Sequence, residues 1–311
     1  MAKRGIKRKV LVTGGAGFIG SHIVELLDEQ KYEVVVVDNL STGNPRYLPL
    51  HVKLYEMDLQ NEEIEKVLRV EKPEIVIHQA AQVDVQKSMK DPFTDAENNL
   101  LATIRLLTYS HLYGVKKIIY ASSCAVYGET ADCSISESFP IQPISFYGVS
   151  KYIPEFYIKL FSELYGLSYT ILRYANVYGP RQTPKGEGGV VSIFFKQMMS
   201  GQSPYIFGDG NQTRDFIYVK DVAMANVLAI TKGENGVFNI GRNEKTSINE
   251  LYRLMSSFLQ RPPEPIYQPR RKGDIPYSRL DNSKAINNLL WKPKYSLIQG
   301  LEESFKYYFN C

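Results

Sequence analysis

The segment Thr13-Gly14-Gly15-Ala16-Gly17-Phe18-Ile19-Gly20 decides how the first part of this chain folds. It follows a short apolar run at 10–12, and it opens a stretch in which apolar residues recur with helical spacing. Gly14 permits a tight turn, Gly17 lets the backbone approach a pyrophosphate, and Gly20 lets the helix pack closely on the strand. Free N–H groups at the start of that helix favour an anion. The segment therefore predicts a dinucleotide site between a strand and a helix.

Short apolar runs and helical stretches alternate beyond this segment. Residues 34–37 are four valines in a row, which is typical of a strand buried on both faces of a parallel sheet. The alternation predicts an α/β fold with a Rossmann-type, doubly wound parallel sheet. The other expected strands are 52–55, 75–77, 118–120, 169–172 and 237–240, and the expected helices are 62–70, 98–113, 147–165, 192–200, 220–231, 247–259 and 297–308.

The alternation breaks after Leu172, and proline and glycine become frequent from 179 to 210. We therefore expect a dinucleotide-binding domain in residues 1–175, to which residues 216–240 return. A smaller C-terminal substrate-binding lobe would be formed by residues 176–215 and 241–311.

Composition excludes several classes of protein. The 311 residues are 44% apolar with a net charge of +4, so a full core is expected and nucleic-acid binding is not. The three cysteines lack the paired spacing of a disulfide framework or a zinc site, so no metal is expected. No stretch approaches the roughly 18 apolar residues of a membrane span. These features predict a cytoplasmic protein without a membrane partner.

Asp38 closes the second expected strand at the distance from the glycines where a ribose-binding carboxylate is found in dinucleotide sites. Such a carboxylate accepts hydrogen bonds from both ribose hydroxyls and repels a 2′-phosphate. The residue therefore favours NAD over NADP as the cofactor. Asp58, after the third expected strand, is a candidate neighbour of the adenine.

Tyr147 and Lys151 are four residues apart, so they share one face of the expected helix. A free tyrosine has a pKa of about 10, and a nearby ammonium lowers the pKa by favouring the phenolate. Such a pair can take a proton from a substrate hydroxyl while hydride leaves the carbon. Ser123 follows the strand at 118–120, at the edge of the sheet where ligands bind, and its hydroxyl can bond the reacting oxygen.

Together these segments resemble the extended short-chain dehydrogenase/reductases of the NAD-dependent epimerase/dehydratase family, and within it the UDP-glucose 4-epimerases. The resemblance covers nearly the whole chain. The segments that carry it are 13–22, 38–43, 78–82, 122–128, 147–151, 173–182, 207–222 and 271–284.

This resemblance implies NAD as the cofactor, a UDP-sugar as the substrate and a homodimer as the assembly. The family's proton-transfer trio falls here on Ser123, Tyr147 and Lys151. In the family's 4-epimerases the sugar loses its C4 hydride to NAD, the 4-keto sugar turns, and the hydride returns to the other face. The implied cofactor-binding residues are Gly14, Gly17, Phe18, Ile19, Gly20, Asp38, Asn39, Asp58, Leu59, Ala80, Ala81 and Lys151.

The substrate side is also implied by the resemblance. Asn176 and Arg214 match the family's diphosphate-binding residues, and Phe207 matches the residue that flanks the uracil. Arginine suits this role because its planar fork binds phosphate oxygens in pairs. The full implied set is Asn176, Val191, Phe207, Arg214, Arg271, Asp274 and Ser278.

Two positions bear on which reaction and which sugar are used. Related dehydratases carry an Asp-Glu pair where this chain has Cys124-Ala125, and decarboxylating relatives keep a Glu at the position of Ala125, so epimerisation is favoured. In UDP-glucose 4-epimerases a bulky Tyr closes the pocket around the 2-substituent of the sugar. The matching residue here is Ser278, or Tyr277 if the alignment slips by one. A serine leaves room for an N-acetyl group.

Three alternatives stay open. Arg181 or Lys185 could pair with the carboxylate of a uronic acid, which would indicate a UDP-glucuronate 4-epimerase. A catalytically silent NAD-binding regulator is a second alternative, and an enzyme that releases free NADH is a third.

Pro154 lies inside the expected catalytic helix and should kink it, which bears on the predicted dimer.

Overall fold

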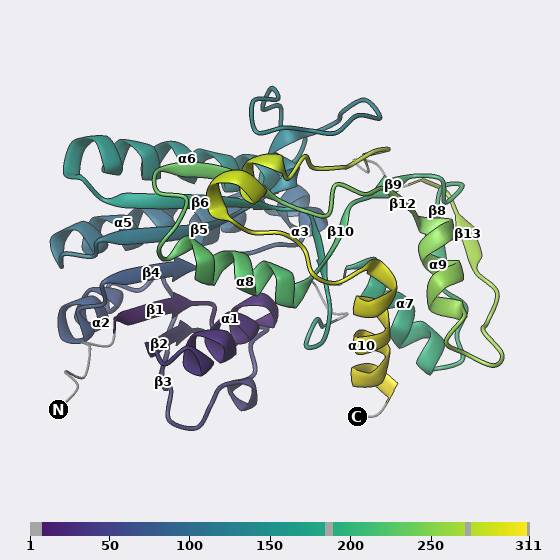
Figure 1. The fold of residues 1–311 in the computed structure, drawn as a ribbon, viewed down its shortest axis with the longest axis horizontal. Coiled ribbons are helices and arrows are strands. Elements are labelled where there is room, and N and C mark those ends of the chain that lie inside the picture. Colours follow the sequence, from purple (N-terminus) through teal and green to yellow (C-terminus); the bar gives the residue numbers. More distant parts are fainter. Residues whose placement is uncertain (1–7, 184–188, 271–274, 310–311) are drawn as a thin grey trace.

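A computed structural model describes residues 8–183, 189–270 and 275–309. Within these ranges seven parallel strands form one sheet, in the order β11-β6-β5-β4-β1-β2-β3 (Figure 1). This confirms the predicted Rossmann-type sheet. The strands are β1 (Lys9–Thr13), β2 (Glu33–Asp38), β3 (Lys53–Glu56), β4 (Ile75–His78), β5 (Lys117–Ser123), β6 (Ser168–Tyr174) and β11 (Gly236–Ile240).

The four valines of β2 explain why this sheet is buried on both faces. Val34 and Val36 belong to one apolar cluster, whereas Val35 and Val37 belong to another. Because side chains alternate along a strand, each face of β2 presents valine to a layer of helices. The continuous run therefore requires helices on both sides.

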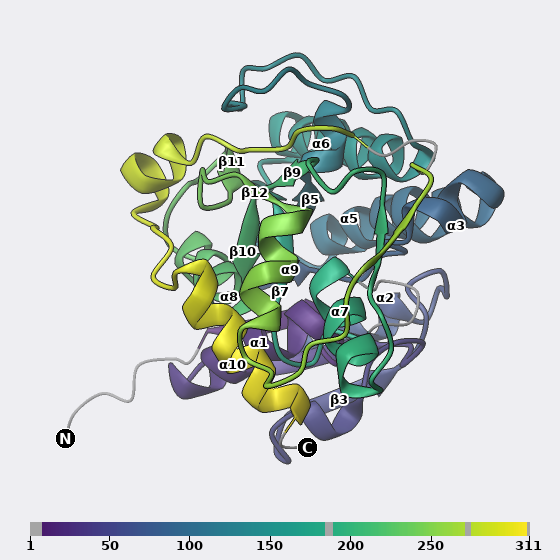
Figure 2. The same ribbon diagram turned by 90° about the vertical axis from the view of Figure 1, so that its right-hand side faces the viewer.

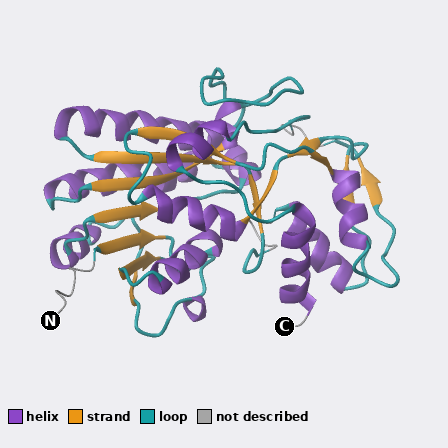
Figure 3. Ribbon diagram, viewed as in Figure 1, coloured by secondary structure: helices purple, strands orange, loops and turns teal. Residues whose placement is uncertain are grey.

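Helices cover both faces of the sheet, so the main body has three layers (Figure 3). One face packs against α1 (Phe18–Glu29), α8 (Val219–Ala229) and η4 (Ala285–Leu289), and the other against α2 (Ile64–Glu71), α5 (Ala102–Leu112) and α6 (Phe146–Tyr165). The chain between β4 and α5 forms α3 (Val85–Lys90), α4 (Pro92–Ala96) and the π-helical turn η2 (Glu97–Leu101).

A smaller lobe lies beyond the carboxyl ends of the strands, at the right of Figure 1 and facing the viewer in Figure 2. A separate apolar cluster forms its core. Its elements are β7 (Asn176–Tyr178), α7 (Val190–Met199), β8 (Tyr205–Phe207), β9 (Thr213–Arg214), β10 (Phe216–Tyr218), β12 (Thr246–Ser247), α9 (Ile248–Ser256), β13 (Ile266–Gln268) and α10 (Leu297–Phe309).

The chain crosses between the two bodies more than once. After the first elements of the lobe, α8 packs on α1 and β11 pairs with β6. Ala285, Leu289 and Trp291 then pack in the main core, although they fall in the range that the sequence assigned to the lobe. The lobe is thus held to the sheet at several points along the chain.

Helix α6 runs from Phe146 to Tyr165 without interruption, even though Pro154 lies inside it. Ser145 caps its start by accepting the N–H of Gly148, and Gly166 ends it in the left-handed conformation with φ 70°.

Among the described helices, none combines the length and the apolar character that crossing a bilayer requires.

Candidate active site

The glycine turn after β1 is packed so tightly that side chains are excluded. Gly14 has a φ of +66°, and a Cβ on it would lie 2.7 Å from the backbone N of Ala80. A Cβ on Gly20 would lie 2.0 Å from the carbonyl oxygen of Gly14. Gly17 caps α1 without a side-chain hydrogen bond, and the first turn of α1 has no acidic residue. The positive end of the α1 dipole is therefore available to an anion such as a pyrophosphate.

Asp38 lies at the end of β2, close to this turn. Its Oδ2 accepts the N–H of Ala16 at 2.9 Å, and its Oδ1 accepts the N–H of Leu40 at 2.8 Å. Burial raises the pKa of Asp38, while these backbone donors oppose the rise. Each carboxylate oxygen keeps a further lone pair, which suits hydrogen bonds from ribose hydroxyls.

A cavity of about 690 Å³ opens where the strands of the sheet end. Most residues that the sequence assigned to the cofactor contribute to its wall, and so do four residues assigned to catalysis or to the substrate. The predicted residues that line it are Gly14, Gly17, Phe18, Ile19, Gly20, Asp38, Asn39, Asp58, Leu59, Ala80, Ala81, Ser123, Tyr147, Asn176 and Val191. The structure therefore brings these residues to one place.

Tyr147 and Lys151 enter the site from the first two turns of α6. The N–H of Tyr147 donates to Ser88 Oγ at 3.1 Å, which fixes the start of the helix. Lys151 is buried beside the cavity rather than in its wall, with Nζ 5.2 Å from the centre of the Tyr120 ring. Tyr120 in turn donates its hydroxyl to the carbonyl of Lys151 at 3.2 Å. The spacing of four residues places the lysine one turn from the tyrosine.

Ser123 comes from a different element, the end of β5. Its Oγ accepts the N–H of Ala125 at 3.2 Å and so caps the short helix η3 (Cys124–Tyr127). The hydroxyl hydrogen is not used by that contact and can be donated. Ser123 and Tyr147 thus line the same cavity from β5 and α6. That both bond one reacting oxygen stays a prediction.

A buried ion pair lies behind these catalytic candidates. Glu155, on α6, is fully buried and binds Arg173 of β6 through two hydrogen bonds of 3.0 and 2.6 Å. Ser122, the neighbour of Ser123, donates its hydroxyl to the same carboxylate at 2.7 Å. Glu155 therefore joins the helix that carries Tyr147 to β6 through Arg173, and to the strand that carries Ser123 through Ser122.

The remaining substrate candidates lie outside the main cavity wall. Phe207 lines a second, smaller cavity of about 290 Å³ together with Arg270 and Tyr277. Arg214 lies on β9, where its backbone is opposite Thr246 of the antiparallel strand β12. The predicted Arg271 and Asp274 lie outside the described residues.

Ser278 is buried next to the catalytic loop. The Cys124 thiol bonds the Ser278 hydroxyl, and burial raises the pKa of that thiol. Tyr277, by contrast, faces the smaller cavity. Of the two positions that the sequence left open for the sugar gate, Ser278 is therefore the one in contact with Cys124, the neighbour of Ser123 in the chain.

Gln182 is a residue that sequence reasoning missed. Its side chain lines the main cavity, its Nε2 donates to the carbonyl of Val177 at 3.1 Å, and its buried Oε1 has no hydrogen-bond partner among the described residues. A buried acceptor without a partner is costly, so this oxygen suits a ligand donor. The pattern Gly179-Pro180-Arg181-Gln182 marks a turn, but it does not indicate which way the amide points.

Arg181 is engaged on the outside of the same turn. Its guanidinium pairs with Glu25 at 3.2 Å, donates to Ser21 at 3.3 Å and lies 5.3 Å from the centre of the Tyr47 ring. These contacts hold the side chain against α1, and it lines neither cavity.

Among the described residues, no group of three or more His, Cys, Asp and Glu side chains is placed to bind a metal ion.

The model of the NAD dependent epimerase/dehydratase family matches residues 10–241. The chain belongs to this family. NAD is accordingly its cofactor, and the tight glycine turn and the uncapped start of α1 fit that molecule.

Three members of the family illustrate the similarity. The UDP-glucose 4-epimerase of Mycolicibacterium smegmatis is 38% identical over 309 residues, which cover 97% of this chain and 99% of that protein. The crystal structure of the UDP-glucose 4-epimerase of Thermotoga maritima with UDP-glucose is 46% identical, with a TM-score of 0.95 over 97% of this chain and 99% of that one. The UDP-N-acetylglucosamine 4-epimerase of Methanobrevibacter ruminantium, in complex with UDP-N-acetylmuramic acid, is 37% identical, with a TM-score of 0.93 over 98% and 99%.

Proposed function

We propose that this chain is a UDP-hexose 4-epimerase that interconverts UDP-glucose and UDP-galactose. The observation that carries the proposal is the convergence of Ser123, Tyr147 and the glycine turn on one cavity. Similarity over nearly the full length to proteins named UDP-glucose 4-epimerase supports the same reaction.

The proposed chemistry is proton transfer at the C4 hydroxyl of the sugar. Tyr147 would take the proton in one direction and return it in the other, and Ser123 would hold the reacting oxygen by a hydrogen bond. The Lys151 ammonium, one helical turn from Tyr147, favours the ionised tyrosine and would hold the nicotinamide ribose. When bound, NAD supplies a reversible acceptor for the C4 hydride. The 4-keto sugar then has to turn within the cavity before the hydride returns.

The nucleotide must stay fixed while the sugar turns. Asn176 and Arg214 are our candidates for the diphosphate, together with Val191 in the cavity wall and Phe207 beside the uracil. Arg271 and Asp274 complete this proposed set. Gln182 is a candidate for a sugar hydroxyl because its buried oxygen lacks a partner among the described residues.

Two features bear on the reaction and on the choice of sugar. Ala125 puts no carboxylate beside Ser123, so the acid that dehydration needs is absent from that loop. The small Ser278 side chain lies next to Cys124. It matches the position of the bulky tyrosine that closes the pocket in UDP-glucose 4-epimerases, and we expect a serine there to admit an N-acetyl group on C2 of the sugar. We therefore propose that UDP-N-acetylglucosamine and UDP-N-acetylgalactosamine are also substrates.

We also propose that the chain acts as a cytoplasmic homodimer. Phe156, Leu160 and Leu164 are exposed and four residues apart, so they form one apolar stripe along α6. Leu101, the last residue of η2 directly before the adjacent helix α5, and Leu112, the last residue of α5, are also exposed. An apolar surface shared by two neighbouring helices suits a four-helix contact between two copies.

A UDP-glucuronate 4-epimerase is the second candidate, because structures of this family accommodate several sugars. Its support is weaker here, since Arg181 is occupied by Glu25, Ser21 and Tyr47. Lys185, the other cation considered, lies outside the described residues. A silent regulator is disfavoured because both Tyr147 and Lys151 are present.

A product assay tests the proposal. Purified protein is incubated separately with UDP-galactose, UDP-GalNAc and UDP-glucuronate, and the products are separated by chromatography. We expect conversion of the first two to their C4 epimers. The Tyr147→Phe variant should lose at least about 100-fold in kcat, the usual contribution of a general base, while it still binds NAD. Conversion of UDP-glucuronate alone would establish the second candidate, and NAD binding without any conversion would reject the enzyme.

A further inference from the structure

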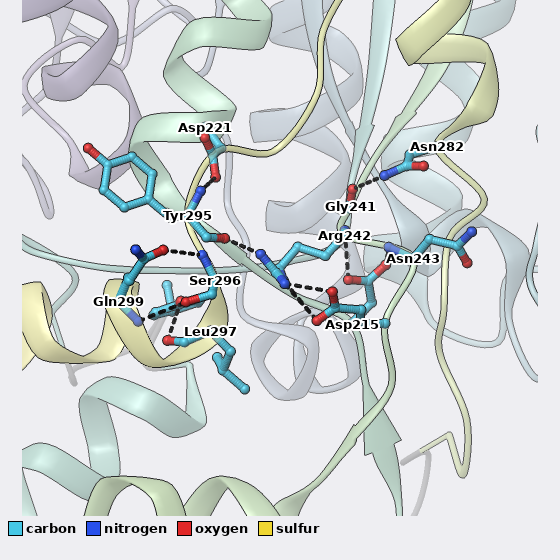
Figure 4. A network of polar contacts seen from close by, with 12 residues as sticks. Asp215, Asp221, Gly241, Arg242, Asn243, Asn282, Tyr295, Ser296, Leu297 and Gln299 are labelled. Atoms are coloured by element: carbon cyan, nitrogen blue, oxygen red, sulfur yellow. Dashed lines mark hydrogen bonds and ion pairs between the residues drawn. The ribbon is translucent and has the colours of Figure 1, made fainter.

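Asp215 is a buried carboxylate that the proposed reaction does not use. It lies between β9 and β10 and is fully buried. Figure 4 shows its carboxylate directed at the turn after β11. Because burying an ionised group is costly unless it is hydrogen-bonded, the partners of this side chain indicate what it does.

Backbone N–H groups from two distant segments bind this carboxylate. The N–H groups of Arg242 and Asn243 donate to it at 2.9 and 3.1 Å, and the N–H of Leu280 donates at 3.1 Å. A Cβ on Gly241 would lie 2.5 Å from Asp215 Oδ2, so only glycine lets this turn approach. The carboxylate therefore fixes the turn after β11 and the segment at Leu280 relative to each other.

The backbone of Asp215 fixes a third segment. Its carbonyl oxygen accepts the N–H of Asn176 at 2.9 Å and the side-chain Nδ2 of Asn176 at 3.4 Å. The second contact orients the amide of Asn176, one of the proposed diphosphate ligands. Asp215 thus acts through its carbonyl on one side and through its carboxylate on the other.

Three proposed substrate contacts meet at this residue. Arg214 is its neighbour in the chain, Asn176 is bonded to its carbonyl, and Ser278 lies two residues before Leu280. These contacts come from parts of the chain that are far apart in sequence, and Asp215 is the residue that joins them. Neither described cavity includes Asp215 in its wall.

Arg242 extends the network toward α10. Its guanidinium pairs with Glu244 and donates to the carbonyl of Tyr295 (Figure 4). Asp221, on α8, accepts the N–H groups of Lys294 and Tyr295 at 2.9 and 3.1 Å. Asp221 is therefore a second buried carboxylate of the same kind, but its partners include none of the proposed substrate contacts.

We propose that Asp215 is a positioning residue for the nucleotide sugar. It sets the relative positions of Asn176, Arg214 and Ser278 without touching either ligand. This inference rests on the proposed function, since it assumes that those three residues bind a UDP-sugar. It predicts that loss of the carboxylate weakens UDP-glucose binding and leaves NAD binding intact.

The test compares Asp215→Asn with the matched control Asp221→Asn. Both variants replace a buried carboxylate that accepts backbone N–H groups, so both should lose thermal stability. Calorimetry measures the binding of NAD to each variant freed of NAD, and the binding of UDP-glucose to each variant loaded with NAD. We expect Asp215→Asn to raise the Kd of UDP-glucose on the order of 10- to 100-fold, the size expected for lost hydrogen bonds to a charged group. The Kd of NAD should stay within about twofold.

Several results would overturn the inference. Equal weakening of UDP-glucose in the two variants would show a general loss of stability, and equal weakening of UDP-glucose and NAD in Asp215→Asn would show an unspecific effect. If Asp215→Asn does not fold, Gly241→Ala replaces it, because its Cβ would push against the same carboxylate. Wild-type protein that fails to bind UDP-glucose would reject the proposed function itself, whereas wild-type binding with no effect of either Asp215→Asn or Gly241→Ala rejects only this inference.

Discussion

The two halves of the site are built in different ways. On the cofactor side, four of the predicted contacts lie at or just after the end of a strand of the sheet: Gly14 after β1, Asp38 at the end of β2, Asp58 after β3 and Ala80 after β4. On the nucleotide-sugar side, Asn176, Arg214 and Ser278 come from separate segments that a single buried residue joins. The first half is specified by local sequence and sheet topology, and the second depends on polar contacts between distant segments.

The largest effect on ligand binding in this comparison should come from the glycine turn, where the backbone on the cofactor side leaves no space for a Cβ. Gly20→Ala places a Cβ 2.0 Å from the carbonyl oxygen of Gly14, so the turn has to open. We expect the affinity for NAD to fall on the order of 100-fold, or about 2.7 kcal/mol. Calorimetric titration with NAD measures this loss.

Gly114→Ala is the control for this variant. Gly114 also has a positive φ, of 76°, but a Cβ on it would meet no atom within 4 Å. It should cost some stability and leave NAD binding unchanged. Equal NAD affinity in Gly20→Ala and wild type would mean that the cofactor half is not specified by this turn.

The largest effect on stability should come from the ion pair that ties α6 to the sheet. Glu155→Gln leaves the buried Arg173 guanidinium without its charge partner. Removing one partner of a buried pair typically costs 3–5 kcal/mol, and we expect a loss of about that size in urea unfolding. The double variant Glu155→Met, Arg173→Met should recover most of it, because no buried charge remains. A loss below about 1 kcal/mol in the single variant would mean that the pair does not hold the helix.

A smaller effect, on the sugar half, should follow from Ser278→Tyr. A ring at this position takes up the space beside Cys124 that an N-acetyl group would need. We expect kcat/KM for UDP-GalNAc to fall on the order of tenfold, about 1.4 kcal/mol, relative to UDP-galactose. UDP-galactose serves as the internal control, since its turnover should persist. Unchanged use of UDP-GalNAc would remove Ser278 from the gate.

The smallest effect is a difference in pH dependence between the halves. On the cofactor side, His78 lies between Thr13 and Thr103, and burial lowers its pKa to about 3. Below its ordinary value of 6.5 the unfolded chain binds a proton that the folded chain does not, so stability falls on acidification. Between pH 7 and pH 5.5 this amounts to about 1 kcal/mol.

Asp215, on the sugar side, changes the stability with pH in the opposite direction. Burial raises its pKa to about 6, against the pull of its backbone donors, so below pH 6 the folded chain takes up a proton before the unfolded chain does. Urea unfolding at several pH values checks both signs. His78→Asn should flatten the fall in stability above pH 6, and a slope equal to that of wild type would contradict the assignment to His78.

The same contrast explains what the sequence could predict. The seven strands of the sheet were predicted within one to three residues at each end, because valine and isoleucine runs between glycine and polar turns have a strong local pattern. The topology then places Ser123 at the strand ends with the glycine turn, as expected for a doubly wound sheet. The position of Tyr147 could be predicted as well, because α6 begins within one residue of the start of its helical pattern of apolar residues.

Contacts between distant segments could not be predicted in this way. The choice between Tyr277 and Ser278 turns on a register of one residue in an irregular segment, where Tyr277 lines the smaller cavity and Ser278 is buried against Cys124. The Gln182 oxygen, which lacks a partner among the described residues, and the paired guanidinium of Arg181 both depend on the direction of a side chain in one turn. Neither direction leaves a pattern in the sequence.

The pairing of β11 with β6 has a consequence for synthesis of the protein. In the finished fold β11 covers the edge of β6, but residues 175–235 lie between these two strands in the chain. A nascent chain therefore carries β6 with an open edge until Ile240 has left the ribosome. Its free N–H and C=O groups, on the largely apolar strand Ser168–Tyr174, can meanwhile pair with another chain. The lobe that completes the catalytic site is thus also the segment that lengthens the period in which this protein is prone to aggregate.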